Sequence, residues 1–239
     1  MNFQKIKEIS KYRRGSFPQP YTDQSYYGGE GSMPFVQVAD VTENLNLVEK
    51  TKNSISKKAQ SKSVYVPKGT VLVTLQGSIG RVAITQYDSY VDRTLMIFTD
   101  LDKSLNKEYF AYALRAKFEK EKKHARGITI KTITKEEMEE FLIPIPSLEK
   151  QKEIVNYITL IKLSIDEDKR KISLYDELLK SRFNVMFDCS DNSDKKLLRD
   201  FCEVITKGTT PTTLGYQFID EGINFVKIEC ITNEHTFLK

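Results

Sequence analysis

The sequence is poor in the residues that most often build catalytic and metal sites. Among its 239 residues it has two histidines, no tryptophan and three cysteines, Cys189, Cys202 and Cys230, none in a CxxC pair. An odd number of separated cysteines argues against a disulfide framework and favours a reducing compartment. Two distant histidines supply neither clustered zinc ligands nor a Ser-His-Asp triad. We therefore expect no metal and no cofactor.

Long hydrophobic runs are also missing. No uninterrupted apolar stretch reaches the ~18 residues that a membrane-spanning helix needs, and the N-terminal MNFQKIKEIS lacks the apolar core of a signal peptide. We expect a cytoplasmic protein with no membrane partner. Its formal net charge of +4 permits a nucleic-acid partner without requiring one.

The short motifs of common nucleic-acid enzymes are absent as well. There is no GxxxxGK[ST] phosphate loop, no Pro-Asp that would open a PD…ExK nuclease site, and no Asn-Pro-Pro-Tyr or Asp-Pro-Pro-Tyr of an adenine methyltransferase. The carboxylates at 119, 121 and 166–168 are interpreted as charges on helix surfaces. The sequence therefore predicts a protein that is not an enzyme; a stand-alone nuclease remains a third hypothesis, which metal-dependent cleavage by the purified chain would revive.

What the chain does have is one long segment, 147–187, without proline or glycine. Its apolar residues recur in steps of three and four, with Asp168 and Arg182 occupying two turns of the same stripe, which is typical of a coiled-coil seam. A helix of this length would span on the order of 60 Å and would need a partner helix to bury its seam. The predicted seam, and thus the dimer interface, consists of Ile154, Ile158, Ile161, Ile165, Ile172, Tyr175, Leu179 and Met186.

The preceding 146 residues predict a β-rich globule. Phe3–Ser10 is predicted as a short helix or turn with Phe3, Ile6 and Ile9 inward, and 11–20 as an irregular loop because of Gly15 and two prolines. Thr134 followed by Glu137 predicts a capping box. Strands are predicted at 34–41, on both sides of the turn at 67–69, at 81–85 and at 94–98, a helix at 106–123, and an extended segment at 141–146.

Beyond a polar linker at 188–196, the chain begins to repeat itself. Leu198-Arg-Asp-Phe201 matches Ile6-Lys-Glu-Ile9 in character, and Phe225-Val-Lys-Ile228 matches Phe35-Val-Gln-Val38, at an offset of about 190. We interpret this as an internal duplication whose second copy, 197–239, is truncated, with chance similarity as the alternative. The predicted fold class is α+β, a β-rich globule followed by a long coiled-coil helix and the start of a second repeat.

Three stretches carry a resemblance to a known family. IPIPSLEKQKEIVNYI at 143–158, LVTLQGSIGRVAI at 72–84 and RGITIKTIT at 126–134 resemble the specificity subunit of type I restriction-modification systems. The resemblance implies a target-recognition domain at 1–146 that reads half of a split DNA sequence, a spacer helix at 147–187, and a stub of a second target-recognition domain. It also implies double-stranded DNA, methyltransferase (modification) subunits and restriction subunits as partners, which supply the catalysis.

Basic and amide side chains around glycines fit this implication, because arginine and lysine suit guanine edges and phosphates while glutamine suits adenine. The candidate DNA-binding residues are Lys11, Arg13, Arg14, Gln76, Ser78, Arg81, Lys122, Lys123, Arg126, Thr129 and Lys131. We expect the chain to pair through its long helix as an antiparallel, two-fold homodimer. The alternative is a coiled-coil scaffold or regulator whose β globule binds protein, and separation of the three basic segments in space would favour it.

Overall fold

The computed structural model describes residues 2–124, 133–187, 196–219, 221–223, 225–227 and 230. These fall into two compact units, 1–173 and 174–239. All of the described strands lie in the first unit, as does the beginning of the 40-residue helix α4 (Leu148–Phe187). After residue 195 the described elements with printed bounds are two 3-10 turns, Leu198–Asp200 and Pro211–Leu214.

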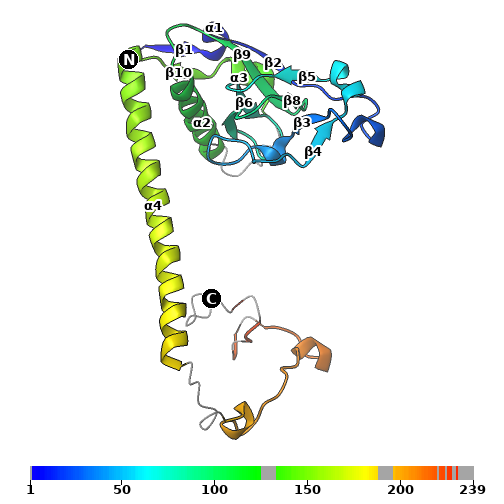
Figure 1. The fold of residues 1–239 in the computed structure, drawn as a ribbon, viewed down its shortest axis with the longest axis vertical. Coiled ribbons are helices and arrows are strands. Elements are labelled where there is room, and N and C mark those ends of the chain that lie inside the picture. The colour runs from blue at the N-terminus through cyan, green and yellow to red at the C-terminus, as the bar shows by residue number, and fades with distance from the viewer. Residues whose placement is uncertain are drawn as a thin grey trace. The chain divides into compact units, whose positions relative to one another are not determined.

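The strands of the first unit form three sheets (Figure 1). β1 pairs with β10 in a two-stranded ribbon, the central sheet has the order β2-β9-β6-β7, and the outer sheet has the order β4-β3-β8-β5 with β3 and β8 parallel. The bounds are β1 Phe3–Lys5, β2 Ser10–Arg14, β3 Met33–Val36, β4 Asn53–Ile55, β5 Val64–Val66, β6 Val71–Thr74, β7 Val82–Ile84, β8 Ser89–Val91, β9 Leu95–Leu101 and β10 Leu142–Pro144.

The central sheet is covered on both faces. Because side chains alternate along a strand, Val71 and Val73 of β6 point to one face and Leu72 to the other. The first pair joins the cluster built around helix α2 (Lys107–His124), whereas Leu72 joins a cluster with Val36 of the outer sheet. All four residues of β6 are therefore buried, as expected for a strand between two layers.

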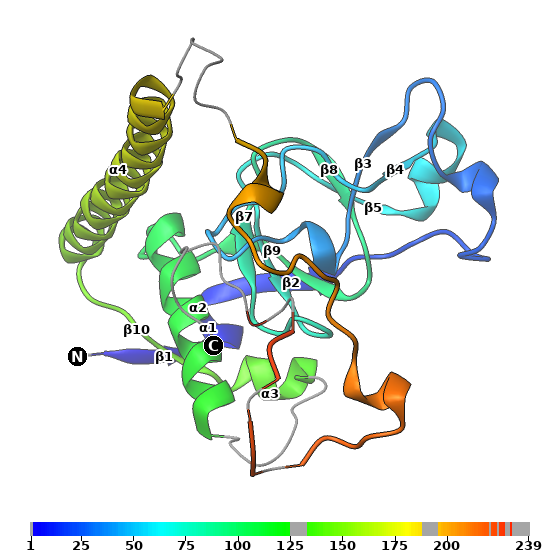
Figure 2. The ribbon, with the colours of Figure 1, turned by 90° about the horizontal axis from the view of Figure 1, so that it is seen from below.

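Helix α2 covers its face of the central sheet with residues spaced four apart. Phe110, Leu114 and Phe118 are fully buried, and the Phe110 ring meets Phe98 of β9 edge-on at a centroid distance of 5.0 Å. In Figure 2, α2 lies between the strands and the first turns of α4. The predicted helix at 106–123 is confirmed with this amphipathic face.

The start of α4 is tied to the globule by a buried glutamine. Gln151 accepts a hydrogen bond at Oε1 from the backbone N–H of Asn106 (2.7 Å) and donates from Nε2 to the carbonyls of Ser104 and Pro146 (both 2.8 Å). Val155, one turn later, belongs to the α2 cluster. The first two turns of α4 are thus part of the globule's core.

Two predictions for the N-terminal segment are wrong. Residues 11–14 are not irregular, because β2 forms a ladder with β9 in which Arg13 pairs with Ile97 and Arg14 with Met96. Phe3 does not point inward: it lies on β1 and is 52% exposed, whereas Ile6 and Ile9 of α1 (Ile6–Ile9) are buried as predicted.

Other predicted elements are found in place. Helix α3 (Lys135–Glu139) begins with the predicted capping box, in which the Thr134 and Glu137 side chains each accept from the other's backbone N–H. The predicted strand at 34–41 ends at Val36, and Val38–Asp40 form a 3-10 turn. Strand β8 was not predicted.

The proposed repeat shows one shared local feature. At the start of the first copy the backbone N–H of Lys5 donates to the Glu8 carboxylate at 3.0 Å, and at the start of the second the N–H of Leu197 donates to the Asp200 carboxylate at 3.1 Å. A short helical turn follows in both copies. The duplication stays a prediction that this match supports.

Candidate nucleic-acid interface

Basic residues gather at one end of the central sheet. Arg14 is the last residue of β2, and the N–H of the following Gly15 donates to Leu95 O of β9 at 3.2 Å. Leu95 pairs in turn with Thr74 of β6. The Thr74 N–H donates to Arg81 O, just before β7, at 3.0 Å. Arg14, the turn after Thr74, and Arg81 therefore lie in one row across four strands. With strands about 4.8 Å apart, the row is roughly 15 Å wide, which we call the basic edge.

Glycine conformation shapes the turn at 75–81. Gly80 has a φ of +73°, and a Cβ on it would lie 2.5 Å from the Cβ of Phe118, so the turn packs directly on α2. The Thr74 hydroxyl oxygen accepts from the N–H of Arg81 at 3.0 Å. This packing leaves Ser78 exposed at the tip, and Gln76 and Arg81 partly exposed.

The side of the basic edge nearest α2 is hollowed into a pocket of about 560 Å³. Arg81 is oriented there by hydrogen bonds to the carbonyl of Val41 (3.3 Å) and the carboxylate of Glu43 (3.5 Å). Lys122 also lines the pocket and pairs with Glu119 at 2.8 Å. The lining residues are Thr42, Glu43, Gly77, Ser78, Ile79, Gly80, Arg81, Val82, Arg115, Glu119 and Lys122.

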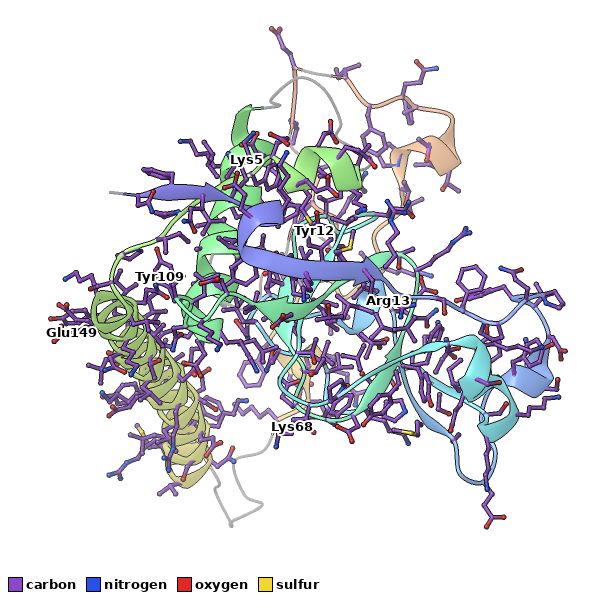
Figure 3. All side chains as sticks on the ribbon, turned by 90° about the horizontal axis from the view of Figure 1, so that it is seen from above. Lys5, Tyr12, Arg13, Lys68, Tyr109 and Glu149 are labelled. Atoms are coloured by element: carbon purple, nitrogen blue, oxygen red, sulfur yellow. The ribbon has the colours of Figure 1, made fainter. Side chains whose placement is uncertain are left out.

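Arg13 and Arg14 point to opposite faces of the central sheet because they are adjacent on a strand. Both are exposed, and neither forms an ion pair with any residue that the structure describes. Figure 3 shows Arg13 following Tyr12 along β2. Lys11, three residues before Arg14 and so roughly 10 Å from it, pairs with Asp100 across the ladder at 3.6 Å. Arg13 and Arg14 are therefore the cations of β2 most available to a phosphate or a base.

Part of the third predicted segment lies outside the described residues. Arg126, Thr129 and Lys131 fall there, as does the side chain of Lys123. The flanks are described: Lys122 lines the pocket at the basic edge, and the N–H of Ile133 donates to Leu75 O at 3.2 Å. Both flanks thus lie at the 75–81 turn. Arg14 of the first predicted segment, the turn of the second and Lys122 of the third lie at one edge, which is the arrangement that the DNA hypothesis requires, whereas Lys11 lies farther along β2.

Sequence reasoning missed two arginines of this surface. Arg93 lies in the loop between β8 and β9. The carbonyl of the next residue, Thr94, accepts a hydrogen bond from the N–H of Leu75 at 3.1 Å. Arg115 lies on α2 and lines the pocket beside Arg81. Arg93 stands in no glycine-rich or basic stretch of the sequence, and Arg115 precedes the lysine-rich run at 117–123. Strand pairing places the loop of Arg93 at the basic edge, and the packing of α2 on the central sheet places Arg115 there.

The predicted seam of α4 divides into two parts. Ile154 and Ile158 are partly buried and line an apolar groove with Tyr109, Tyr112 and Leu142 of the globule; Figure 3 labels Tyr109 on α2 and Glu149 at the start of α4. The remaining seam residues are 47–71% exposed: Ile161, Ile165, Ile172, Tyr175, Leu179 and Met186.

The described residues contain neither a cluster of metal-binding side chains nor a membrane-spanning helix. No group of three or more histidine, cysteine, aspartate or glutamate residues there is arranged to hold a metal ion. Within the same residues no helix is long and apolar enough to cross a membrane.

These features define a class of protein: a three-sheet α+β globule with a basic edge, followed by a long helix with an exposed apolar seam. A model of the type I restriction modification DNA specificity domain matches residues 1–174. The chain therefore belongs to that family. It is 26% identical over 249 residues to the type I restriction enzyme MjaIX specificity subunit of Methanocaldococcus jannaschii, covering 94% of this chain and 56% of that protein.

Solved structures show the same fold. One chain from a study of complex assembly and conformational transition of the type I R-M system superposes with a TM-score of 0.61 at 22% identity, covering 81% of this chain and 46% of that one. The HsdS subunit from Thermoanaerobacter tengcongensis gives 0.53 at 22% identity, covering 71% and 39%. The chain spans about half the length of the relatives that it matches.

Proposed function

We propose that this chain is the DNA-recognition subunit of a type I restriction-modification system, and that it reads one half of a split target with its globule. The observation that carries the proposal is the basic edge. Arg14 and Arg81 stand in one row across the central sheet, beside the amide of Gln76, and Arg13 precedes Arg14 with its side chain on the opposite face. Fixed cations position the DNA phosphates, and arginine and glutamine side chains also fit guanine and adenine edges.

Catalysis belongs to partners in this proposal. The chain recruits modification subunits, which methylate the DNA, and restriction subunits, which cleave it. The support is its membership in the family together with the missing methyltransferase and nuclease motifs.

DNA binding is tested by removing charge from the basic edge. Replacing Arg13 and Arg14 by glutamine should weaken binding to duplex DNA and reduce the slope of log K against log salt by about two, since each lost phosphate contact releases one counterion fewer. Arg170 and Lys180, exposed on α4, form the matched pair: their replacement by glutamine should leave the slope unchanged. Equal effects of the two pairs would contradict a specific role for the edge.

The target itself is tested in cells. When the chain is co-expressed with its cognate modification subunit, that subunit should methylate adenines within a split motif. Genome-wide mapping of methylated adenines would reveal the motif. No new methylation, in a host where both proteins accumulate and co-purify, would overturn the proposal.

We further propose that two copies pair antiparallel through α4. The exposed seam supports this, because Ile165, Ile172 and Leu179 are 47%, 62% and 69% exposed in the single chain, and apolar positions at this spacing gain stability only against a second helix. Two-fold symmetry would make the half-sites identical, so the methylated motif should be an inverted repeat around a non-specific spacer.

Light scattering tests the pairing directly. Replacing Ile165 and Leu179 by aspartate should convert a dimer to a monomer without changing the unfolding of the globule. The control replaces Ser173 and Ser181, which lie on α4 off the seam, by aspartate and should remain a dimer. A monomeric wild-type chain at micromolar concentration would refute the pairing and leave the DNA-binding proposal standing.

A further inference from the structure

A second pocket opens where the central and outer sheets meet, on the opposite side of the central sheet from the first. Its volume is about 690 Å³. The β8–β9 loop forms its rim. Two backbone hydrogen bonds hold the loop there: the N–H of Ser16 donates to Val91 O (2.9 Å), and the N–H of Asp92 donates to Val36 O (3.0 Å). The lining residues are Phe17, Tyr21, Gln37, Val38, Ala39, Lys52, Asn53, Asp92, Arg93 and Thr94.

The second pocket is continuous with the basic edge. Val38 lines it, and a Cβ on Gly77 of the 75–81 turn would lie 3.4 Å from the Val38 side chain. The backbone N–H groups of Leu75 and Gly15 donate to Thr94 O and Leu95 O, at the C-terminal end of the same loop. A duplex lying along Arg14, Gln76 and Arg81 would therefore pass the mouth of this pocket.

Two side-chain amides meet inside it. Asn53 Nδ2 donates to Gln37 Oε1 at 2.7 Å, and Gln37 Nε2 donates to the hydroxyl of Tyr21. Each of these bonds uses one amide hydrogen. Asn53 keeps its Oδ1 and its second N–H, since no other described residue engages them. A donor and an acceptor side by side on one planar amide match the N7 and N6 positions of an adenine edge.

The amides are held by a buried carboxylate behind them. Asp40 is 3% exposed and accepts from the backbone N–H of Gln37 (2.8 Å) and from that of Lys52 (3.2 Å), the residue before Asn53. Both chain segments that carry the amides are thus fixed to one anchor. A preorganised polar group loses less entropy on binding than a mobile one.

An arginine stands at the mouth. The Arg93 guanidinium lies 4.8 Å from the ring centroid of Phe17, which meets Tyr21 edge-on at 4.7 Å. The neighbouring Asp92 is buried and accepts from the Thr94 hydroxyl at 2.7 Å. Arg93 is exposed and forms no ion pair with the residues that the structure describes, so its charge is available to a phosphate beside the pocket.

We propose that this pocket is the adenine-reading element of the half-site, with Asn53 contacting the base edge, Gln37 orienting Asn53, and Arg93 holding the adjacent phosphate. The inference rests on the proposed DNA recognition and assigns it a specificity-determining residue. None of the three residues belongs to the glycine-flanked basic segments of the sequence.

Selection from a library of random duplexes by the full-length chain tests the inference. The wild-type chain should enrich a motif with at least one adenine. Asn53→Ala should lose the preference at one adenine position, with affinity for the wild-type motif falling by about 5- to 150-fold, the range expected for one bidentate base contact. Asn53→Asp, which keeps the side-chain shape, should prefer cytosine at that position, because a carboxylate accepts from cytosine N4.

Controls separate the possible failures. Asn156→Ala, at an exposed asparagine of α4, should enrich the wild-type motif. Arg93→Gln should weaken binding to all sequences and leave the adenine preference intact. If Asn53→Ala and Asn53→Asp melt at the wild-type temperature and still enrich every adenine, the inference is overturned while DNA recognition stands. A wild-type chain that enriches no motif overturns both.

Discussion

Helices α2 and α4 both carry large apolar residues at helical spacing, but only α2 hides them. Phe110, Leu114 and Phe118 of α2 are fully buried against the central sheet, whereas Ile172 and Leu179 of α4 are more than 60% exposed. The two patterns look equally amphipathic in the sequence. The difference is that α2 lies over the central sheet, whereas most of α4 packs on no sheet among the residues that the structure describes.

The apolar residues of the two helices therefore have different roles. The residues of α2 stabilise the globule and support the 75–81 turn, since Phe118 is the contact surface for Gly80. The exposed seam of α4 contributes little to the stability of a single chain, because its side chains are not removed from water.

The largest effect is expected at Phe118. Its replacement by alanine removes a buried ring that packs edge-on against Phe141 at 5.2 Å, and should lower the free energy of unfolding of the globule by about 3–5 kcal/mol. Phe183→Ala, at a 61% exposed position of α4, is the matched control and should leave globule unfolding within ~0.5 kcal/mol. Urea denaturation of both variants measures the difference. Comparable losses would contradict the contrast between the helices.

Gly80→Ala should come next. Its φ of +73° disfavours any residue with a Cβ, and the added methyl group would collide with Phe118, so we expect a loss of about 2–4 kcal/mol. Gly77→Ala has a similar φ of +67° but only an ordinary approach to Val38. It should cost about 1–2 kcal/mol, the backbone strain alone. Equal melting temperatures for the two variants would contradict the close contact between Phe118 of α2 and the 75–81 turn.

Gln151 is the polar exception on α4, fully buried where the helix joins the globule. Alanine there would leave the N–H of Asn106 and two carbonyls without their partner, at a cost of about 1–3 kcal/mol. The exposed neighbour Lys152 provides the control, since Lys152→Ala should be near neutral. Hydrogen exchange at the first turn of α4 should rise in Gln151→Ala alone. Unchanged exchange would show that the joint does not depend on this side chain.

The smallest effect concerns Glu140, just before β10. Hydrogen bonds from Lys5 and Lys7 lower its pKa from 4.5 to about 2. A depressed carboxylate pKa contributes stability above pH 4.5, and this contribution is lost as the pH falls toward 2. Glu140→Gln should therefore be slightly less stable than wild type at pH 7, with the gap closing between about pH 4.5 and 2. Denaturant midpoints across this range, with Glu30→Gln as control, test it; a constant gap would contradict it.

Local signals predicted much of the fold. The capping box of Thr134 and Glu137, the spacing of Phe110, Leu114 and Phe118, and the strand at 94–98 all appear where expected. Such features depend on neighbours within a few residues, and the sequence displays those directly. Strand β2 was missed because Arg13 and Arg14 are extended only by pairing with β9, more than eighty residues away.

The candidate site was predicted only in part, because the sequence displays local features and not the contacts between distant segments. Arg13, Arg14, Gln76, Ser78 and Arg81 stood out because each lies near a glycine in a polar stretch. Gln37, Asn53 and Arg93 gave no such signal. They come from three separate segments and meet only because β3, β4 and β8 are neighbours in the outer sheet.

Elements with a local hydrophobic period and clear end signals could be predicted from the residues alone, above all α4, which has no proline or glycine, and its apolar seam. The sequence also displays the glycines that allow the 75–81 turn. The tertiary structure decided which apolar faces are buried within the chain and which stay exposed, and which distant polar side chains share a surface. Burial and side-chain proximity depend on how strands pair across the chain, and that pairing is not encoded in any single window of residues.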